Sequence, residues 1–125
     1  MKWLALRSYV LLLRIGAMMR WRGIQPVHEL VLNSKVDGSN RCRNAELNQL
    51  LKAVDLACIC YPKRVLCLQR SAVTVQLLRA NGFEAEMVIG VQTLPFASHA
   101  WVEINHVVVN DKPYVTELYR PIERC

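Results

Sequence analysis

The spacing of apolar residues along the chain changes from a helical to a strand-like pattern after Gly82. Well before that point, residues 1–23 alternate apolar runs with single arginines. Arg7 and Arg14 fall on one face of a helix and leave the rest apolar, which favours an amphipathic helix packed on the domain over one lying on a bilayer. The apolar pieces between the arginines are far shorter than the roughly 20 residues that a membrane span needs, so we predict no span.

Two more helices are predicted before the change of pattern. A polar stretch at 33–43 carries turn-forming residues and separates them from the first helical unit. A helix that can begin at Asn44 is stopped near Pro62. The next helix runs from about 66 to 80, where Gly82 belongs to the stop signal.

The last third of the chain has the two-residue period or the continuous β-branched runs that are typical of strands. These runs predict three or four short antiparallel strands, at 85–91, 100–104, 107–109 and 114–118. Helices followed by strands predict an α+β fold in which the helices pack on one face of a small antiparallel sheet.

The size of the chain limits it to one domain. With 125 residues, of which 53% are apolar or aromatic, it can form one hydrophobic core and has no room for a second domain. We divide this domain, 1–125, into a helical amino-terminal part at 1–61 and a part at 62–125 that holds the last helix and the sheet.

The net charge of +6 is unevenly distributed, because residues 1–82 hold 13 of the 16 basic residues and 4 of the 10 acidic ones. This basic half is a candidate surface for an acidic partner, although a solvated basic face explains most of these arginines equally well. Aromatic residues are not interleaved with the arginines in a recognised pattern, so nucleic-acid binding is not predicted.

Five cysteines, an odd number without regular spacing and without a secretion signal before them, predict reduced thiols and a cytoplasmic location. Their spacing does not fit zinc ligands, and the scattered glycines do not form a phosphate-binding loop. We therefore expect neither a metal nor a cofactor.

Cys67 is the candidate nucleophile, because it falls in the first turn of a predicted helix, where the helix dipole favours a thiolate. Lys63 and Arg64 add positive potential just before it, and the small Ser71 one turn later leaves room for a substrate. Taken alone, a cysteine on an apolar helix is more often a core residue.

His99 is the candidate base, since it opens a strand and can project toward a helix packed on the sheet. Glu103 points to the same side but lies about 13 Å along the strand at the usual rise, which is too far to orient the imidazole. Asp111 stands opposite His99 if the hairpin pairs residue 103 with 107 through the odd loop 104–106. A two-residue loop, 105–106, would place His99 opposite Lys112 and Asp111 on the wrong face.

Several segments of the chain, taken together, resemble one known family. They are Cys67-Leu68-Gln69-Arg70-Ser71, Leu77-Leu78-Arg79-Ala80-Asn81-Gly82, Val88-Ile89-Gly90-Val91, Pro95-Phe96-Ala97-Ser98-His99-Ala100-Trp101-Val102-Glu103 and Val109-Asn110-Asp111. In order and spacing over roughly 60–115 they closely resemble the lasso-peptide leader peptidases, the transglutaminase-like cysteine proteases of lasso-peptide maturation.

The resemblance implies a transglutaminase-like, papain-like core with Cys67, His99 and Asp111 as its catalytic triad. It also implies that the chain removes the leader from a ribosomally made precursor peptide through a thioester. Since only about 60 residues precede the motif, the chain resembles the stand-alone protease form. The expected partners are then the leader region of the precursor, a separate leader-recognition protein and the ATP-dependent lasso cyclase.

In the implied reaction the backbone N–H of Cys67 helps to hold the oxyanion, and Gln69 and the Trp101 indole are candidates for a second donor. Core packing is the alternative interpretation of Trp101. Two other functions stay open at this point. One is a transglutaminase-type acyl transfer to an amine on the same triad, and the other is a non-catalytic peptide-binding module.

Overall fold

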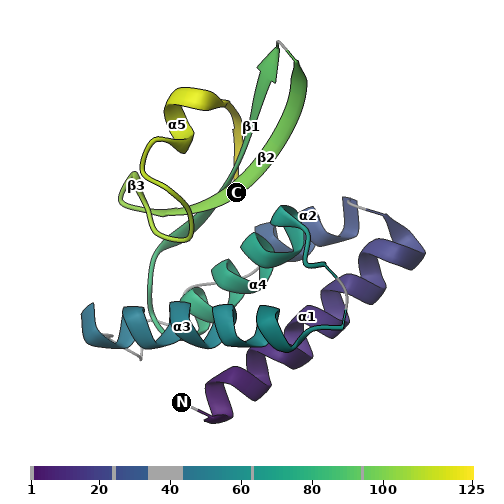
Figure 1. Cartoon of the computed structure of the whole chain (residues 1–125), viewed down its shortest axis with the longest axis vertical. Helices are drawn as coiled ribbons and strands as arrows, with labels where there is room; N and C mark the ends of the chain where they lie inside the picture. Colours follow the sequence, from purple (N-terminus) through teal and green to yellow (C-terminus); the bar gives the residue numbers. More distant parts are fainter. Residues whose placement is uncertain (1, 24, 34–43, 63, 94) are drawn as a thin grey trace.

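A computed structural model describes all residues except 1, 24, 34–43, 63 and 94, and it leaves the side chains of residues 2 and 44–46 undescribed. The polar stretch predicted at 33–43 therefore lies almost entirely outside the described residues. The described chain forms two parts, a group of four helices and a small antiparallel sheet with a short helix beside it (Figure 1). This arrangement is the predicted α+β fold.

The four large helices come first in the chain. They are α1 (Lys2–Arg22), α2 (Gln25–Asn33), α3 (Asn44–Cys60) and α4 (Cys67–Ala80). Of these, α2 was not predicted as a separate element. The helix α1 packs against α3 and α4 as expected for an amphipathic helix. In the described ranges, no helix is both long and apolar enough to cross a membrane.

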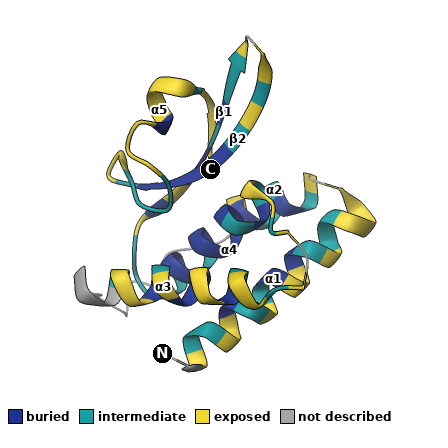
Figure 2. Cartoon of the chain, in the orientation of Figure 1, coloured by how far each residue is buried: buried dark blue, intermediate teal, exposed yellow. Residues whose placement is uncertain are grey.

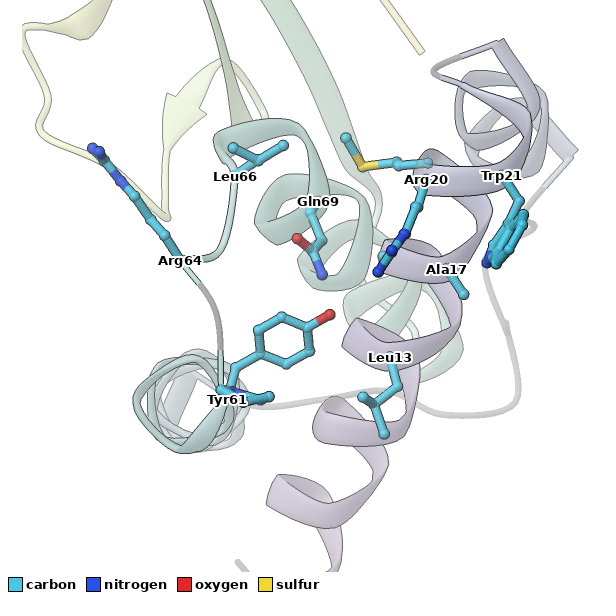
Figure 3. A pocket seen from close by; sticks show the side chains of 11 residues that line it. Leu13, Ala17, Arg20, Trp21, Tyr61, Arg64, Leu66 and Gln69 are labelled. Atoms are coloured by element: carbon cyan, nitrogen blue, oxygen red, sulfur yellow. The ribbon is translucent and has the colours of Figure 1, made fainter.

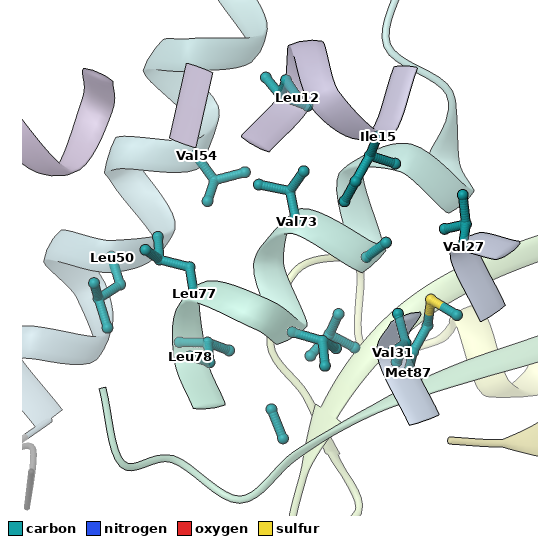
Figure 4. Packing of buried hydrophobic residues seen from close by; sticks show 14 of the residues in the cluster. Leu12, Ile15, Val27, Val31, Leu50, Val54, Val73, Leu77, Leu78 and Met87 are labelled. Carbon is teal, nitrogen blue, oxygen red and sulfur yellow. The ribbon is translucent and has the colours of Figure 1, made fainter. Parts of the chain in front are cut away.

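The central helix of this group is α4, whose residues are mostly buried (Figure 2). Its side chains meet Leu12 and Ile15 of α1 and Val54 of α3 in one apolar core, which Met87 joins from the sheet (Figure 4). The helix ends as predicted, because the N–H of Gly82, at φ +89°, donates to Arg79 O at 3.2 Å. The core thus fixes α4 between the other helices and the sheet.

The sheet has the strand order β3-β2-β1-β4, with all pairs antiparallel. Its strands are β1 (Ala85–Thr93), β2 (Phe96–Ile104), β3 (Val107–Val108) and β4 (Arg120–Arg124). The segment predicted as a strand at 114–118 is instead the short helix α5 (Val115–Leu118), whose Val115 is buried. The true last strand is fully exposed and carries Pro121. It therefore lacks the alternating pattern by which strands are predicted.

The buried carboxylate of Glu103 anchors the last strand to β2. Glu103 Oε2 accepts a hydrogen bond from Trp101 Nε1 at 2.7 Å, and Oε1 accepts one from Arg124 at 2.8 Å. Burial alone would raise the pKa of Glu103, but the two hydrogen bonds and the charge of Arg124 outweigh it and lower this pKa. Glu103 is therefore a structural ion, which agrees with its exclusion as the partner of His99.

Glu103→Gln is expected to lower the free energy of unfolding by about 1 to 3 kcal/mol at neutral pH, since the charged hydrogen bond to Arg124 is lost. A carboxyl whose pKa is lower in the folded chain stabilises it above the unfolded pKa of about 4.3, and this contribution disappears as the pH falls through the folded pKa. The free energy of unfolding, measured in urea, should therefore fall more steeply below about pH 4.3 for the unmodified chain than for the variant. Parallel pH profiles would contradict this role.

Candidate active site

The candidate nucleophile, Cys67, is the first residue of α4, and its side chain is exposed. Leu66 precedes it in extended conformation, and no side chain caps the helix by a hydrogen bond. The first turn also contains no acidic residue. Because the first N–H groups of a helix have no partners within the helix, this end offers donors and positive potential beside the sulfur.

His99 lies in β2 opposite Gly90 of β1. Its ring packs in a cluster with two aromatic side chains, with centroid distances of 6.1 Å to Trp101 and 5.2 Å to Tyr119, which also contact each other. A Cβ atom on Gly90 would come within 2.5 Å of the Trp101 ring, which is completely buried. Glycine at position 90 thus leaves the space in which Trp101 supports the imidazole.

The imidazole and the carboxylate of the predicted triad are in contact, since His99 Nε2 meets Asp111 Oδ2. Both side chains are about three-quarters buried, with 26% of each exposed. The other carboxylate oxygen, Oδ1, accepts a hydrogen bond from the backbone N–H of Lys112 at 2.7 Å. With Nε2 occupied by the carboxylate, Nδ1 is the ring nitrogen that is left for a substrate or a thiol.

The route by which Asp111 reaches His99 differs from the prediction. The hairpin pairs Ile104 with Val107, so the loop has two residues, Asn105 and His106, and both have positive φ. The predicted odd loop is therefore wrong. Asp111 avoids the wrong face because β3 ends at Val108 and the chain bends away from the ladder after a last backbone bond from Val109 N–H to Val102 O at 2.9 Å, so strand alternation no longer sets its direction.

Asn110 holds this bent segment in place and received no role from the sequence, although it stands beside Asp111 in the recognised motif. Its Oδ1 accepts a hydrogen bond from the backbone N–H of Val102 at 2.7 Å, as a strand carbonyl would. Its Nδ2 donates to Ser71 Oγ of α4 at 3.3 Å. Ser71 is only 1% exposed, so it supports Asn110 and does not leave the predicted open room for a substrate.

The sheet face of His99 also differs from the prediction. Val102 of β2 belongs to the core shared with the helices, whereas Trp101 packs with Val88 and Val115 on the other face. His99 lies on the face of Trp101, toward α5, and does not project at the helix layer. Since β3 pairs only with residues 103–104, the edge of β2 beside His99 is covered instead by the segment at 109–111.

One short segment thus connects the contact between His99 and Asp111 to the helix that begins with Cys67. Asn110 contacts Ser71, which lies one turn and about 6 Å along α4 from Cys67. The next residue, Asp111, contacts His99. Among the described residues, no hydrogen bond joins the Cys67 sulfur to His99 or Asp111.

The two side chains predicted as further oxyanion donors are used elsewhere. Gln69 Nε2 donates to Leu12 O of α1 at 2.9 Å, and only 4% of Gln69 is exposed. The Trp101 indole donates to Glu103, as the core interpretation of this residue requires. The backbone N–H groups at the start of α4 are the donors that this arrangement leaves beside Cys67.

Asn110→Ala is expected to lower the free energy of unfolding by about 1 to 3 kcal/mol, because the Val102 N–H loses its acceptor. Ser71→Ala is the matched control, since it removes only the 3.3 Å bond and should cost about 0.5 to 1.5 kcal/mol. Urea unfolding measures both losses. Equal losses would show that the bond to β2 is not what holds this segment.

Comparisons with known proteins identify the family to which the chain belongs. The sequence model of the transglutaminase-like superfamily matches residues 11–124, so the chain belongs to that superfamily. It is also similar to the microcin J25-processing protein McjB of Escherichia coli, with 45% identity over 47 residues. That stretch covers 38% of this chain and 23% of the relative. No solved structure matches the chain.

Proposed function

We propose that the chain is a cytoplasmic cysteine peptidase that removes the leader from a lasso-peptide precursor. The observation that carries this proposal is the contact between His99 and Asp111, next to an Asn110 that is hydrogen-bonded to Ser71 of the helix that begins with Cys67. Membership of the transglutaminase-like superfamily and the similarity to a microcin-processing protein support the same reaction and the same class of substrate.

In the proposed reaction Cys67 gives its proton to His99 Nδ1, and the thiolate attacks the carbonyl carbon at the junction of leader and core. The first N–H groups of α4 stabilise the oxyanion. His99 then protonates the amine of the core peptide as the C–N bond breaks and a thioester forms. Water, deprotonated by His99, hydrolyses the thioester and regenerates the thiol.

Asp111 keeps the imidazole in the tautomer that has its acceptor nitrogen at Nδ1, and it stabilises the imidazolium. Hydrogen bonds between a nucleophile and its base are often long until substrate is bound. We therefore propose that Cys67 and His99 close on each other around the bound peptide.

The basic amino-terminal part is proposed to meet the leader, or a separate leader-recognition protein that presents it to this domain. The ATP-dependent cyclase would then close the ring on the released core. The helix α1 contains four arginines and no acidic residue, which suits an acidic partner.

The test is to incubate the chain with its precursor peptide, with and without the candidate recognition protein. The masses of the products are then measured by mass spectrometry. A peptidase gives a free leader acid, whose mass includes one water, and a free core amine. A leader joined to an added amine would instead support transglutaminase-type transfer. An intact precursor under all conditions would contradict both.

A further inference from the structure

A hollow of about 580 Å³ lies beside the start of α4, bounded by α1, the end of α3 and the segment that leads into α4 (Figure 3). Most of its lining is apolar, and several of the apolar side chains are open to solvent. Trp21 is 80% exposed, Leu66 54% and Leu13 43%. An apolar surface of this kind is typical of a binding site for another apolar group.

The floor of the hollow depends on a glycine. A Cβ atom on Gly16 would come within 2.6 Å of Tyr61 Oη and 2.8 Å of Gln69 Nε2. The bond from Gln69 to Leu12 O holds this floor against α1. The hollow is therefore a formed feature of the helix packing and not a chance gap between side chains.

Two arginines line the hollow. Arg20 points into it, toward Tyr61 and Gln69, whereas the side chain of Arg64 extends away from these two residues (Figure 3). In the described part of the chain neither arginine has an ion-pair partner. A ligand that offers a carboxylate together with an apolar side chain would satisfy both kinds of surface.

The hollow lies next to the candidate nucleophile in the chain, which points to the substrate as its occupant. Leu66 lines it, and the next residue is Cys67. A peptide whose scissile carbonyl lies at the Cys67 sulfur therefore has neighbouring residues within reach of the hollow. We propose that the hollow is a substrate subsite, which binds an apolar side chain and an adjacent carboxylate of the precursor near the scissile bond. This inference rests on the proposed function.

Peptide binding to the full chain carrying Cys67→Ala tests the subsite without cleavage. The probe is a short fluorescein-labelled peptide with one leucine between two glutamates, compared with a peptide in which lysines replace the glutamates. Fluorescence anisotropy should show that the glutamate peptide binds more tightly. Arg20→Glu should weaken its binding about tenfold, and Ala17→Trp, which fills the hollow from an exposed position, should do the same.

Arg14→Glu is the matched control, because Arg14 is an exposed arginine of the same helix that does not line the hollow. Its effect should stay below about twofold, since an exposed charge that does not line the hollow makes no direct contact with the bound group and is screened by salt. An equal loss in Arg14→Glu and Arg20→Glu would overturn the subsite in favour of general attraction to a basic surface. Equal binding of the glutamate and lysine peptides, or full binding to Ala17→Trp, would also overturn it.

Failure of the subsite and failure of the proposed function give different results. If precursor processing depends on Cys67 but none of the hollow variants changes peptide binding, the subsite alone is wrong. If the peptide binds as expected but the unmodified chain leaves the precursor intact, the hollow binds a peptide and the peptidase proposal fails. Circular dichroism of each variant separates both results from misfolding.

Discussion

Replacing Cys67 with alanine is expected to lower the rate of leader release by at least about 10³-fold, because no other group can form the thioester. Cys67 is exposed, so the substitution should change the free energy of unfolding by no more than about 0.5 kcal/mol. Steady-state cleavage followed by mass spectrometry measures the rate, and urea unfolding measures the stability.

Cys60→Ala is the matched control for this substitution, since Cys60 is also an exposed thiol but ends α3 instead of beginning α4. Its rate should remain within about twofold of that of the unmodified chain, as expected for a thiol outside the reacting atoms. Leader release that survives Cys67→Ala, or that is lost equally in Cys60→Ala, would assign the chemistry to another group.

Asp111→Asn is expected to lower kcat by about 10³ to 10⁴-fold, the effect of losing the carboxylate that orients a catalytic histidine. The amide keeps an oxygen for the Lys112 N–H, so the bend of the chain should persist. An amide that turns its NH₂ group toward His99 instead favours the tautomer with a proton on Nδ1, which cannot accept the thiol proton.

The loss should appear in kcat with little change in KM, because Asp111 acts on the imidazole and does not bind the peptide. Glu117→Gln on α5 is a matched control, since it removes an exposed carboxylate outside this contact. A raised KM with kcat preserved would contradict the orienting role and would place Asp111 in substrate binding.

Local signals in the sequence were sufficient for the helix of the nucleophile. Gly82 marks the end of α4 because only a residue that tolerates positive φ closes the helix in this way. Cys67 could be proposed as the nucleophile because it falls in the first turn of the same helix. These features depend on neighbours in sequence, and the structure places them where the pattern does.

Features that depend on tertiary packing were not predictable. The segment at 114–118 is rich in β-favouring residues, yet it folds as α5 because Val115 packs on Trp101 and Val88. The exposed strand β4 carries Pro121 and no alternating pattern, and its pairing with β1 supplies its stability. In both segments the conformation depends on burial and on pairing with residues that are distant in the sequence. A short stretch of sequence does not contain this information.

The contact of Asp111 with His99 could be proposed from the sequence, but its geometry could not. The prediction assumed that the strand after the hairpin continues in register, so that the parity of the loop decides which face Asp111 takes. The chain instead leaves the ladder, and the Asn110 side chain replaces a strand carbonyl at Val102. A side chain that substitutes for backbone pairing leaves no periodic signal.

The most direct test of the proposed active site is to label the chain with a leader peptide whose carboxyl end carries a vinyl sulfone, which captures a thiolate as a thioether. We predict a single adduct, located at Cys67 by peptide mapping, that forms much more slowly in His99→Ala and Asp111→Asn. An adduct at Cys60 or Cys58, or equal labelling of Cys67 in all three chains, would contradict the triad.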